Sequence, residues 1–226
     1  MNTELKNTLE TLLYSRNVMY SLFHKLTGTP MHTELMNTIT SENTINSIAL
    51  LESNENGFAK DFIEFIKHYD NSSDEAIDKI SDEYTRLFVG PARLVAPPWE
   101  SVYTSIDHTL FQLSTLSVRL WFNRYQLQTD QSSRIADDHI ALMMHFLSYT
   151  SQLAAEALTE NNVEKTRMIL VDQSKFQNQH LLNWILTYEK ALQKSSSFEF
   201  YPQMIHHLVQ FIELDHQLID EMIALI

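Results

Sequence analysis

The chain has 226 residues, with 29 Asp and Glu against 16 Lys and Arg, and therefore a formal net charge of −13. This acidic balance argues against binding to the phosphate backbone of nucleic acids, which requires a basic surface. The sequence contains no cysteine, which excludes disulfides and thiolate metal sites. A basic segment leading into an apolar one is missing at the start, and no run approaches 18 apolar residues, so we expect a soluble, cytoplasmic protein.

Apolar residues recur at helical spacing in the first part of the chain. The series from Leu5 to Leu26 predicts a helix that the Thr27–Pro30 segment ends. Turn-forming residues near Gly57 and Ser73 separate the helices that follow. These helices are expected over residues 31–52, 57–69 and 74–88.

A rigid segment follows the last of these helices. Gly90 suits a helix C-terminus, and Pro91 cannot continue a helix. The Pro97–Pro98 pair then restricts the backbone, so that Trp99 and Tyr103 are presented from a stiff, extended loop. A stiff loop that carries aromatic side chains is typical of a binding surface, although packing of the two rings onto the core is the alternative interpretation.

The second half of the chain is also helical in pattern. Helices are expected over 106–127, 138–159, 161–193 (with a break near Asp172) and 199–225. Strand-like alternation is missing throughout. We therefore predict one all-α domain over residues 1–226, a helical bundle with the proline-rich loop between two central helices.

Signatures of catalysis are weak. With glycines only at 28, 57 and 90, neither a phosphate-binding P-loop nor a dinucleotide-binding turn can be formed. Glu213 and His216 have the Glu-x-x-His spacing of di-iron bundles, but the sequence contains no second such pair. We therefore expect no enzyme, no cofactor and no metal, and a metal-dependent helical enzyme is the least favoured alternative.

Two polar patterns have a structural interpretation. The sequence Asp137-Asp138-His139 precedes an apolar helical run, where an aspartate caps the helix start. His180 and Trp184 are spaced i, i+4 and are expected to pack on one helix face.

The amino-acid sequence of the loop resembles a motif of a known family. The string Tyr84-x-Arg-Leu-Phe-x-Gly-Pro91 and the string Ala96-Pro-Pro-Trp-x-Ser-Val-Tyr103 resemble the signature of the TorD/DmsD family of cytoplasmic redox-enzyme maturation chaperones. The resemblance continues through Asp138-His-Ile-Ala-Leu142 and Phe176-x-x-x-His-Leu-x-x-Trp184, and covers roughly the last two-thirds of the chain.

This resemblance implies a function. Members bind the N-terminal leader, typically a twin-arginine signal peptide, of a molybdenum-cofactor oxidoreductase and delay its export until the cofactor is inserted. The expected partners are then the leader and the apo form of a DMSO-reductase-type catalytic subunit, without nucleic acid or stable membrane insertion. An assembly chaperone of the NarJ type, whose client is not exported, is the alternative. We expect a monomer, with a domain-swapped dimer as the second possibility.

The resemblance also implies a peptide site. Carried over position by position, the site consists of Tyr84, Leu87, Phe88, Pro98, Trp99, Ser101, Tyr103, Asp138 and His139. Architectural roles fall to Gly90, Pro91, Pro97, His180 and Trp184. We expect the apolar members to line a groove that receives a helical peptide, with Asp138 and His139 at its polar edge.

Two of the positions that depart from the family pattern bear on helix geometry. Gln126 stands where glycine is common after Arg-Tyr, so the helix is expected to run on. Leu186 stands where a proline commonly follows the His-Leu-x-x-Trp motif, so the kink associated with it is expected to be missing.

Overall fold

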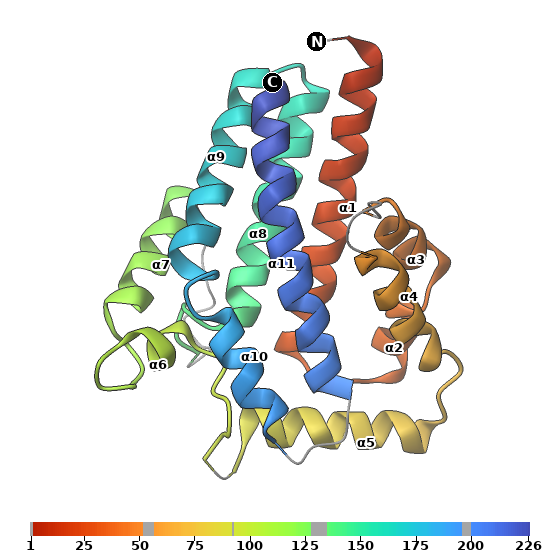
Figure 1. The fold of residues 1–226 in the computed structure, drawn as a ribbon, viewed down its shortest axis with the longest axis vertical. Coiled ribbons are helices and arrows are strands. Elements are labelled where there is room, and N and C mark those ends of the chain that lie inside the picture. The colour runs from red at the N-terminus through yellow and green to blue at the C-terminus, as the bar shows by residue number, and fades with distance from the viewer. Residues whose placement is uncertain (1, 52–56, 92, 128–134, 196–199) are drawn as a thin grey trace.

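Four long helices form the centre of the molecule in the computed structural model (Figure 1). They are α1 (Thr3–Gly28), α8 (Ile140–Thr159), α9 (Val163–His180) and α11 (Phe200–Leu225). Helices α1 and α9 run in one direction and α8 and α11 in the other, which brings both labelled termini to the same end (Figure 1). The structure describes residues 2–51, 57–91, 93–127, 135–195 and 200–226.

Shorter helices surround this bundle. Beside α1 and α11 lie α2 (Thr33–Ile39), α3 (Glu42–Ala49) and α4 (Phe58–His68), as Figure 1 shows. Helix α5 (Asp74–Tyr84) crosses the lower end and continues into a π-helical turn, η1 (Thr85–Val89). The opposite side carries α6 (Glu100–Thr104), α7 (Leu113–Arg124) and α10 (Ile185–Gln193).

These elements confirm the all-α prediction. Among the described residues there is no strand, and the isolated β-bridge between Trp99 and His139 is the one extended pairing. None of the helices in the described ranges combines the length and apolarity needed to cross a bilayer.

Several predicted boundaries are wrong, and each error has a local cause. The helix expected over 31–52 is two helices, because Ser41 ends the first and its hydroxyl caps α3 by accepting from the Thr44 N–H at 3.3 Å. The helix expected over 106–127 begins only at Leu113, and the short α6 was not predicted.

Helices α9 and α7 also differ from expectation. Helix α9 continues through Asp172, and the chain breaks at residues 181–184 without a proline at 186. Helix α7 ends at Arg124, and Gln126 takes a left-handed conformation with φ 56°. The expectations of a break near Asp172, a missing kink and a longer helix are therefore all wrong.

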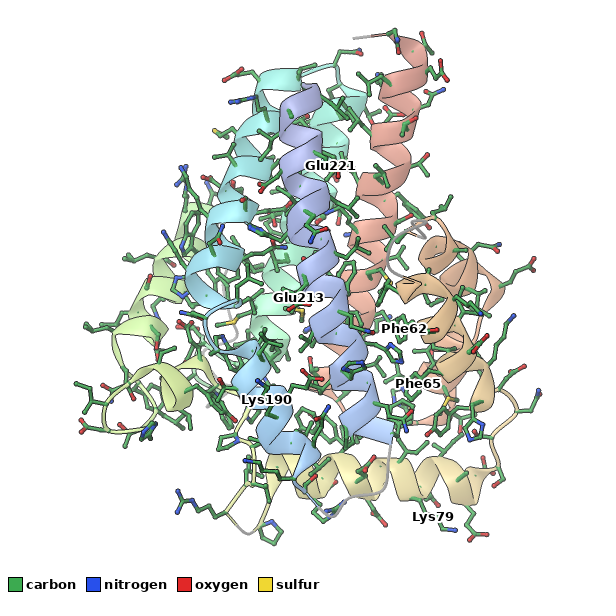
Figure 2. All side chains as sticks on the ribbon, in the orientation of Figure 1. Phe62, Phe65, Lys79, Lys190, Glu213 and Glu221 are labelled. Atoms are coloured by element: carbon green, nitrogen blue, oxygen red, sulfur yellow. The ribbon has the colours of Figure 1, made fainter. Side chains whose placement is uncertain are left out.

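Aromatic rings fill the space between α1, α4 and α11. Phe62 and Phe65 project from α4 toward α11 (Figure 2), and the Phe62 ring stacks on Phe23 of α1 at 5.5 Å between centroids. Glu213 and Glu221 lie on the exposed face of α11 (Figure 2). The apolar stripe predicted for the last helix therefore faces the core.

A buried ion pair joins the first and last helices. Arg16 of α1 is fully buried and donates from Nε to Asp215 Oδ1 of α11 and from Nη2 to Asp215 Oδ2 at 3.1 Å. Gln173 of α9 accepts from Arg16 at 2.8 Å, and Tyr20 and Gln177 donate to Asp215. Because a buried charge is costly without such partners, this network fixes how three of the four central helices pack.

Candidate peptide-binding site

The proline-rich segment is tied to the start of α8. Ile140 N donates to Pro98 O at 2.9 Å, and Glu100 N donates to Asp138 O at 3.1 Å. These bonds form the antiparallel bridge between Trp99 and His139, whose rings meet edge to face at 4.9 Å. Two sequence motifs about 40 residues apart are thereby fixed against each other.

The Asp138 side chain also stabilises the junction between the proline-rich segment and α8. Its carboxylate accepts from the backbone N–H of Ser101 and from the hydroxyl of Thr115, each at 2.8 Å, and the residue is fully buried. Asp138 therefore caps α6, while α8 is capped by His139, whose Nδ1 accepts from the Ala141 N–H at 3.1 Å.

A second buried polar chain holds α6 against α9. His180 Nδ1 lies 2.9 Å from Glu100 Oε2, and His180 Nε2 lies 2.9 Å from Ser117 Oγ. Burial raises the pKa of Glu100, and the contact with His180 opposes that rise. Trp184 donates from Nε1 to the His180 carbonyl at 2.6 Å, so His180 is a hydrogen-bonding centre as well as the packing group that we predicted.

An apolar pocket of about 310 Å³ lies next to the bridge between Trp99 and His139, which both line it. Four predicted site residues line it together: Tyr84, Phe88, Trp99 and His139. The remaining lining comes from α1, from the end of η1 and from the segment at the start of α8: His24, Gly28, Val89, Ile135, Ala141 and Leu142. Because Gly28 has no side chain, it leaves open space at the end of α1.

A larger hollow of about 1030 Å³ also has Trp99 in its lining. Pro97, Val102, Tyr103 and Leu110 belong to its lining. Trp99 lines both hollows. The Tyr103 hydroxyl and the Trp99 Nε1 are buried and have no hydrogen-bond partner within the described part of the chain.

The histidines at the smaller pocket are uncharged at neutral pH. Burial, with a smaller contribution from His24, lowers the pKa of His139 to about 4. Burial also lowers the pKa of His24 and of His145, whose rings stack at 4.7 Å. His24 donates from Nδ1 to the Ala141 carbonyl at 2.9 Å. The pocket is therefore suited to an apolar group, and its described lining contains no carboxylate.

Other residues that were predicted to belong to the site are buried beneath it or shape its backbone. Leu87, Pro98, Ser101 and Asp138 are buried and, within the described residues, belong to neither lining. Gly90 ends η1 with φ 96°, a conformation that favours glycine. Among the remaining architectural residues, Pro91 is exposed, Pro97 lines the larger hollow, and Trp184 stacks on Tyr103.

Sequence reasoning missed the contribution of α1. His24 and Gly28 lie outside the two-thirds of the chain that carries the family resemblance, and Glu100 lies inside it without being singled out. The one available signal was the i, i+4 spacing of His24 and Gly28, which places both residues on the same face at the end of the helix.

A metal centre finds no support in the described part of the chain, where no group of three or more His, Asp or Glu side chains could hold an ion. Glu213 is exposed, and His216 Nδ1 lies 3.0 Å from the Gln177 side-chain oxygen.

Comparison with known proteins identifies relatives of the matched region. The family described as nitrate reductase delta subunit matches residues 51–187. A probable Tat proofreading chaperone DmsD of Haemophilus influenzae is 29% identical over 122 residues, which cover 54% of this chain and 53% of the relative.

Chaperone proteins TorD are also similar. The protein of Aliivibrio salmonicida is 26% identical over 137 residues, covering 61% of this chain and 62% of the relative. That of Vibrio cholerae serotype O1 (El Tor Inaba) is 25% identical over 174 residues, covering 76% of each. The match thus spans less than two thirds of the length of the first two of these relatives.

Proposed function

Because the chain belongs to the nitrate reductase delta subunit family, we propose that it is a chaperone for the maturation of a molybdoenzyme subunit. Membership, together with the similarity to proteins named DmsD and TorD, confirms the resemblance drawn from the Tyr84–Tyr103 motif. We further propose that the chaperone acts in the cytoplasm and binds the N-terminal leader of its client, holding the apo subunit there while the cofactor is inserted.

The observation that supports leader binding is the pair of hollows that share Trp99 in their lining. A twin-arginine leader contains an apolar region that can form a helix, and side chains three or four positions apart lie about 5–6 Å from each other on such a helix. A helix that crosses Trp99 would place one apolar side chain in each hollow. Each large side chain buried in this way contributes roughly 1.5–3 kcal/mol.

The basic part of the leader would be held differently. Neither hollow is lined by a carboxylate in the described part of the chain, so the arginine pair would contact the acidic surface outside them. Exposed ion pairs contribute only about 0.2–1 kcal/mol each, so the hollows supply affinity and the acidic surface orients the peptide.

Affinity capture of the tagged protein from its native cells tests this function, with mass spectrometry of the proteins that co-purify. We expect a molybdoenzyme catalytic subunit that still carries its leader. The synthetic leader of that subunit then serves as the probe, and Trp99→Ala should weaken its binding by about 10- to 100-fold. Trp121→Ala on α7 removes an indole that belongs to neither hollow and is the control. Equal binding by the wild-type and Trp99→Ala proteins would place the leader elsewhere.

The description of the family favours a second candidate, a NarJ-type assembly chaperone whose client is not exported. Replacing both arginines of the probe by glutamine separates the two candidates. Unchanged binding supports the second candidate, and a large loss supports recognition of a twin-arginine leader.

A further inference from the structure

One peptide group fixes the ring protons of two histidines at the smaller pocket. The N–H of Ala141 donates to His139 Nδ1 at 3.1 Å, and the carbonyl of Ala141 accepts from His24 Nδ1 at 2.9 Å. A ring nitrogen that accepts a hydrogen bond carries no proton, and one that donates to a carbonyl must carry it. The two Nδ1 atoms are therefore in opposite states, bare in His139 and protonated in His24.

The same contacts decide the other nitrogen of each ring. Burial lowers the pKa of both histidines, so each ring carries a single proton at neutral pH. His139 then holds its proton on Nε2, which is a donor, whereas His24 has a bare Nε2, which is an acceptor. Because both residues line the smaller pocket, its lining contains one donor and one acceptor of fixed identity.

Both Nε2 atoms are open to a ligand. Within the described part of the chain neither has a hydrogen-bond partner, and neither is among the unpartnered side-chain nitrogens that are closed off from solvent. His139 as a whole is only 6% exposed, so the opening at its Nε2 leads into the pocket that it lines. The Nδ1 and Cε1 atoms of His24 lie 3.9 Å from the position of a Cβ at Gly28, so this ring borders the same space.

The rest of the lining mainly offers apolar contact, for instance from Phe88 and Leu142. The Tyr84 hydroxyl donates to the Thr27 carbonyl at 3.4 Å, and the Trp99 Nε1 is buried. A purely apolar side chain would fill this space, but it would take water away from the two histidine nitrogens without replacing it. Such unsatisfied polar groups are unfavourable.

Ionised groups also fit poorly. A carboxylate can only accept, so it meets the bare Nε2 of His24 with another lone pair. An ammonium or a guanidinium can only donate, so it meets the Nε2 proton of His139 with another proton. A hydroxyl or a primary amide accepts and donates at once and carries no charge.

We propose that the smaller pocket selects an uncharged side chain whose apolar body ends in a hydroxyl or an amide. This end accepts from His139 Nε2 and donates to His24 Nε2. His24 is then a specificity-determining residue, contributed by the helix that lies outside the family resemblance. That the side chain belongs to a client leader rests on the proposed function, whereas the selectivity is a property of the pocket itself.

Small probes that share a phenyl ring test the selectivity without a client. The full chain, isotope-labelled in its histidines, is titrated at neutral pH with toluene, p-cresol, benzamide, benzoate and benzylammonium and followed by NMR. We expect p-cresol or benzamide to bind at least about 5-fold more tightly than toluene, and the two ions to bind roughly 10-fold more weakly than the better neutral probe. Whichever of p-cresol and benzamide binds more tightly distinguishes a hydroxyl from an amide. A purely apolar pocket would prefer toluene, because a hydroxyl loses its water on entry.

Two matched variants assign the effect to His24. His24→Phe keeps a ring and removes the acceptor, so it should reverse the preference in favour of toluene. His145→Phe changes the ring that stacks on His24 at 4.7 Å without altering the lining, and should keep the wild-type preference. Equal circular dichroism and melting temperatures would show that both variants fold.

The nitrogen chemical shifts of the wild-type protein test the basis of the proposal directly. They should show His139 protonated on Nε2 and His24 protonated on Nδ1. Any other protonation pattern would overturn the proposal, as would a wild-type preference for toluene or a p-cresol preference that survives His24→Phe. A leader that does not bind to a protein with the expected probe selectivity would count against the proposed function alone.

Discussion

Filling the smaller pocket from within should abolish its use as a binding site. Gly28 is the last residue of α1 and lines that pocket. A Cβ at this position would lie 3.5 Å from the Ala141 Cβ and 3.9 Å from the His24 ring, which are ordinary van der Waals distances. Gly28→Leu therefore projects its side chain into the pocket without a backbone clash, and Gly28→Ala leaves most of the space open.

The size of the effect follows from what the pocket would otherwise bury. If one large apolar side chain of the leader enters it, exclusion of that side chain removes roughly 1.5–3 kcal/mol, which is about a 10- to 150-fold loss of affinity. Folding should not suffer, because replacing glycine in a helix by a residue with a side chain is favourable by about 0.5–1 kcal/mol in the case of alanine.

Fluorescence anisotropy with the labelled leader of the captured client measures this change. Gly28→Ala should bind within about threefold of wild type and melt at the same temperature or above it. If Gly28→Leu folds and binds the leader as tightly as Gly28→Ala does, the pocket is not where the leader docks, and the assignment of Tyr84, Phe88, Trp99 and His139 to that site is wrong.

Three further predictions concern stability. The pKa of His139 is about 4 in the folded state against 6.5 in the unfolded chain, so the folded state binds fewer protons. Roughly 3 kcal/mol of the free energy of unfolding, present above pH 6.5, is therefore lost as the pH falls to 4. Urea titrations at several pH values should show that the free energy of unfolding of His139→Asn depends less on pH than that of the wild type. Arg16→Met leaves Asp215 buried without its cation and should cost about 3–5 kcal/mol in chemical denaturation, part of which Arg16→Met/Asp215→Leu recovers. Gln126→Gly should raise stability by about 0.5–1 kcal/mol by relieving its left-handed backbone, a gain that calorimetry would detect and that an unchanged melting temperature would refute.

Regular patterns in the sequence predicted the helices well, and individual polar contacts explain the failures. The long apolar series gave the central helices, because most of their stability comes from one buried face. The break at Ser41 depends on one hydroxyl accepting a backbone N–H, and α6 depends on a carboxylate 37 residues away in sequence. Such long-range capping leaves no periodic signal around residues 100–104.

The candidate site could be predicted in part. The motif residues Tyr84, Phe88, Trp99 and His139 converge on one pocket, as the resemblance implied that they would lie near one groove. The part contributed by α1 could not be found, because it depends on how the end of α1 packs beside the start of α8. Whether Asp138 contacts peptide stays a prediction, since its carboxylate is occupied by Ser101 and Thr115.

The buried pair between Arg16 and Asp215 also bears on how the protein is made. The two residues are 199 positions apart, so a ribosome exposes the cation long before its partner has been synthesised. Until then α1 lacks its counter-ion, although α8, against which its end forms the smaller pocket, precedes Asp215 in the chain. Contacts of such sequence separation form late, because the intervening chain must first be ordered. The bundle should therefore close around this pair late in folding, after the segments that line the smaller pocket have been synthesised.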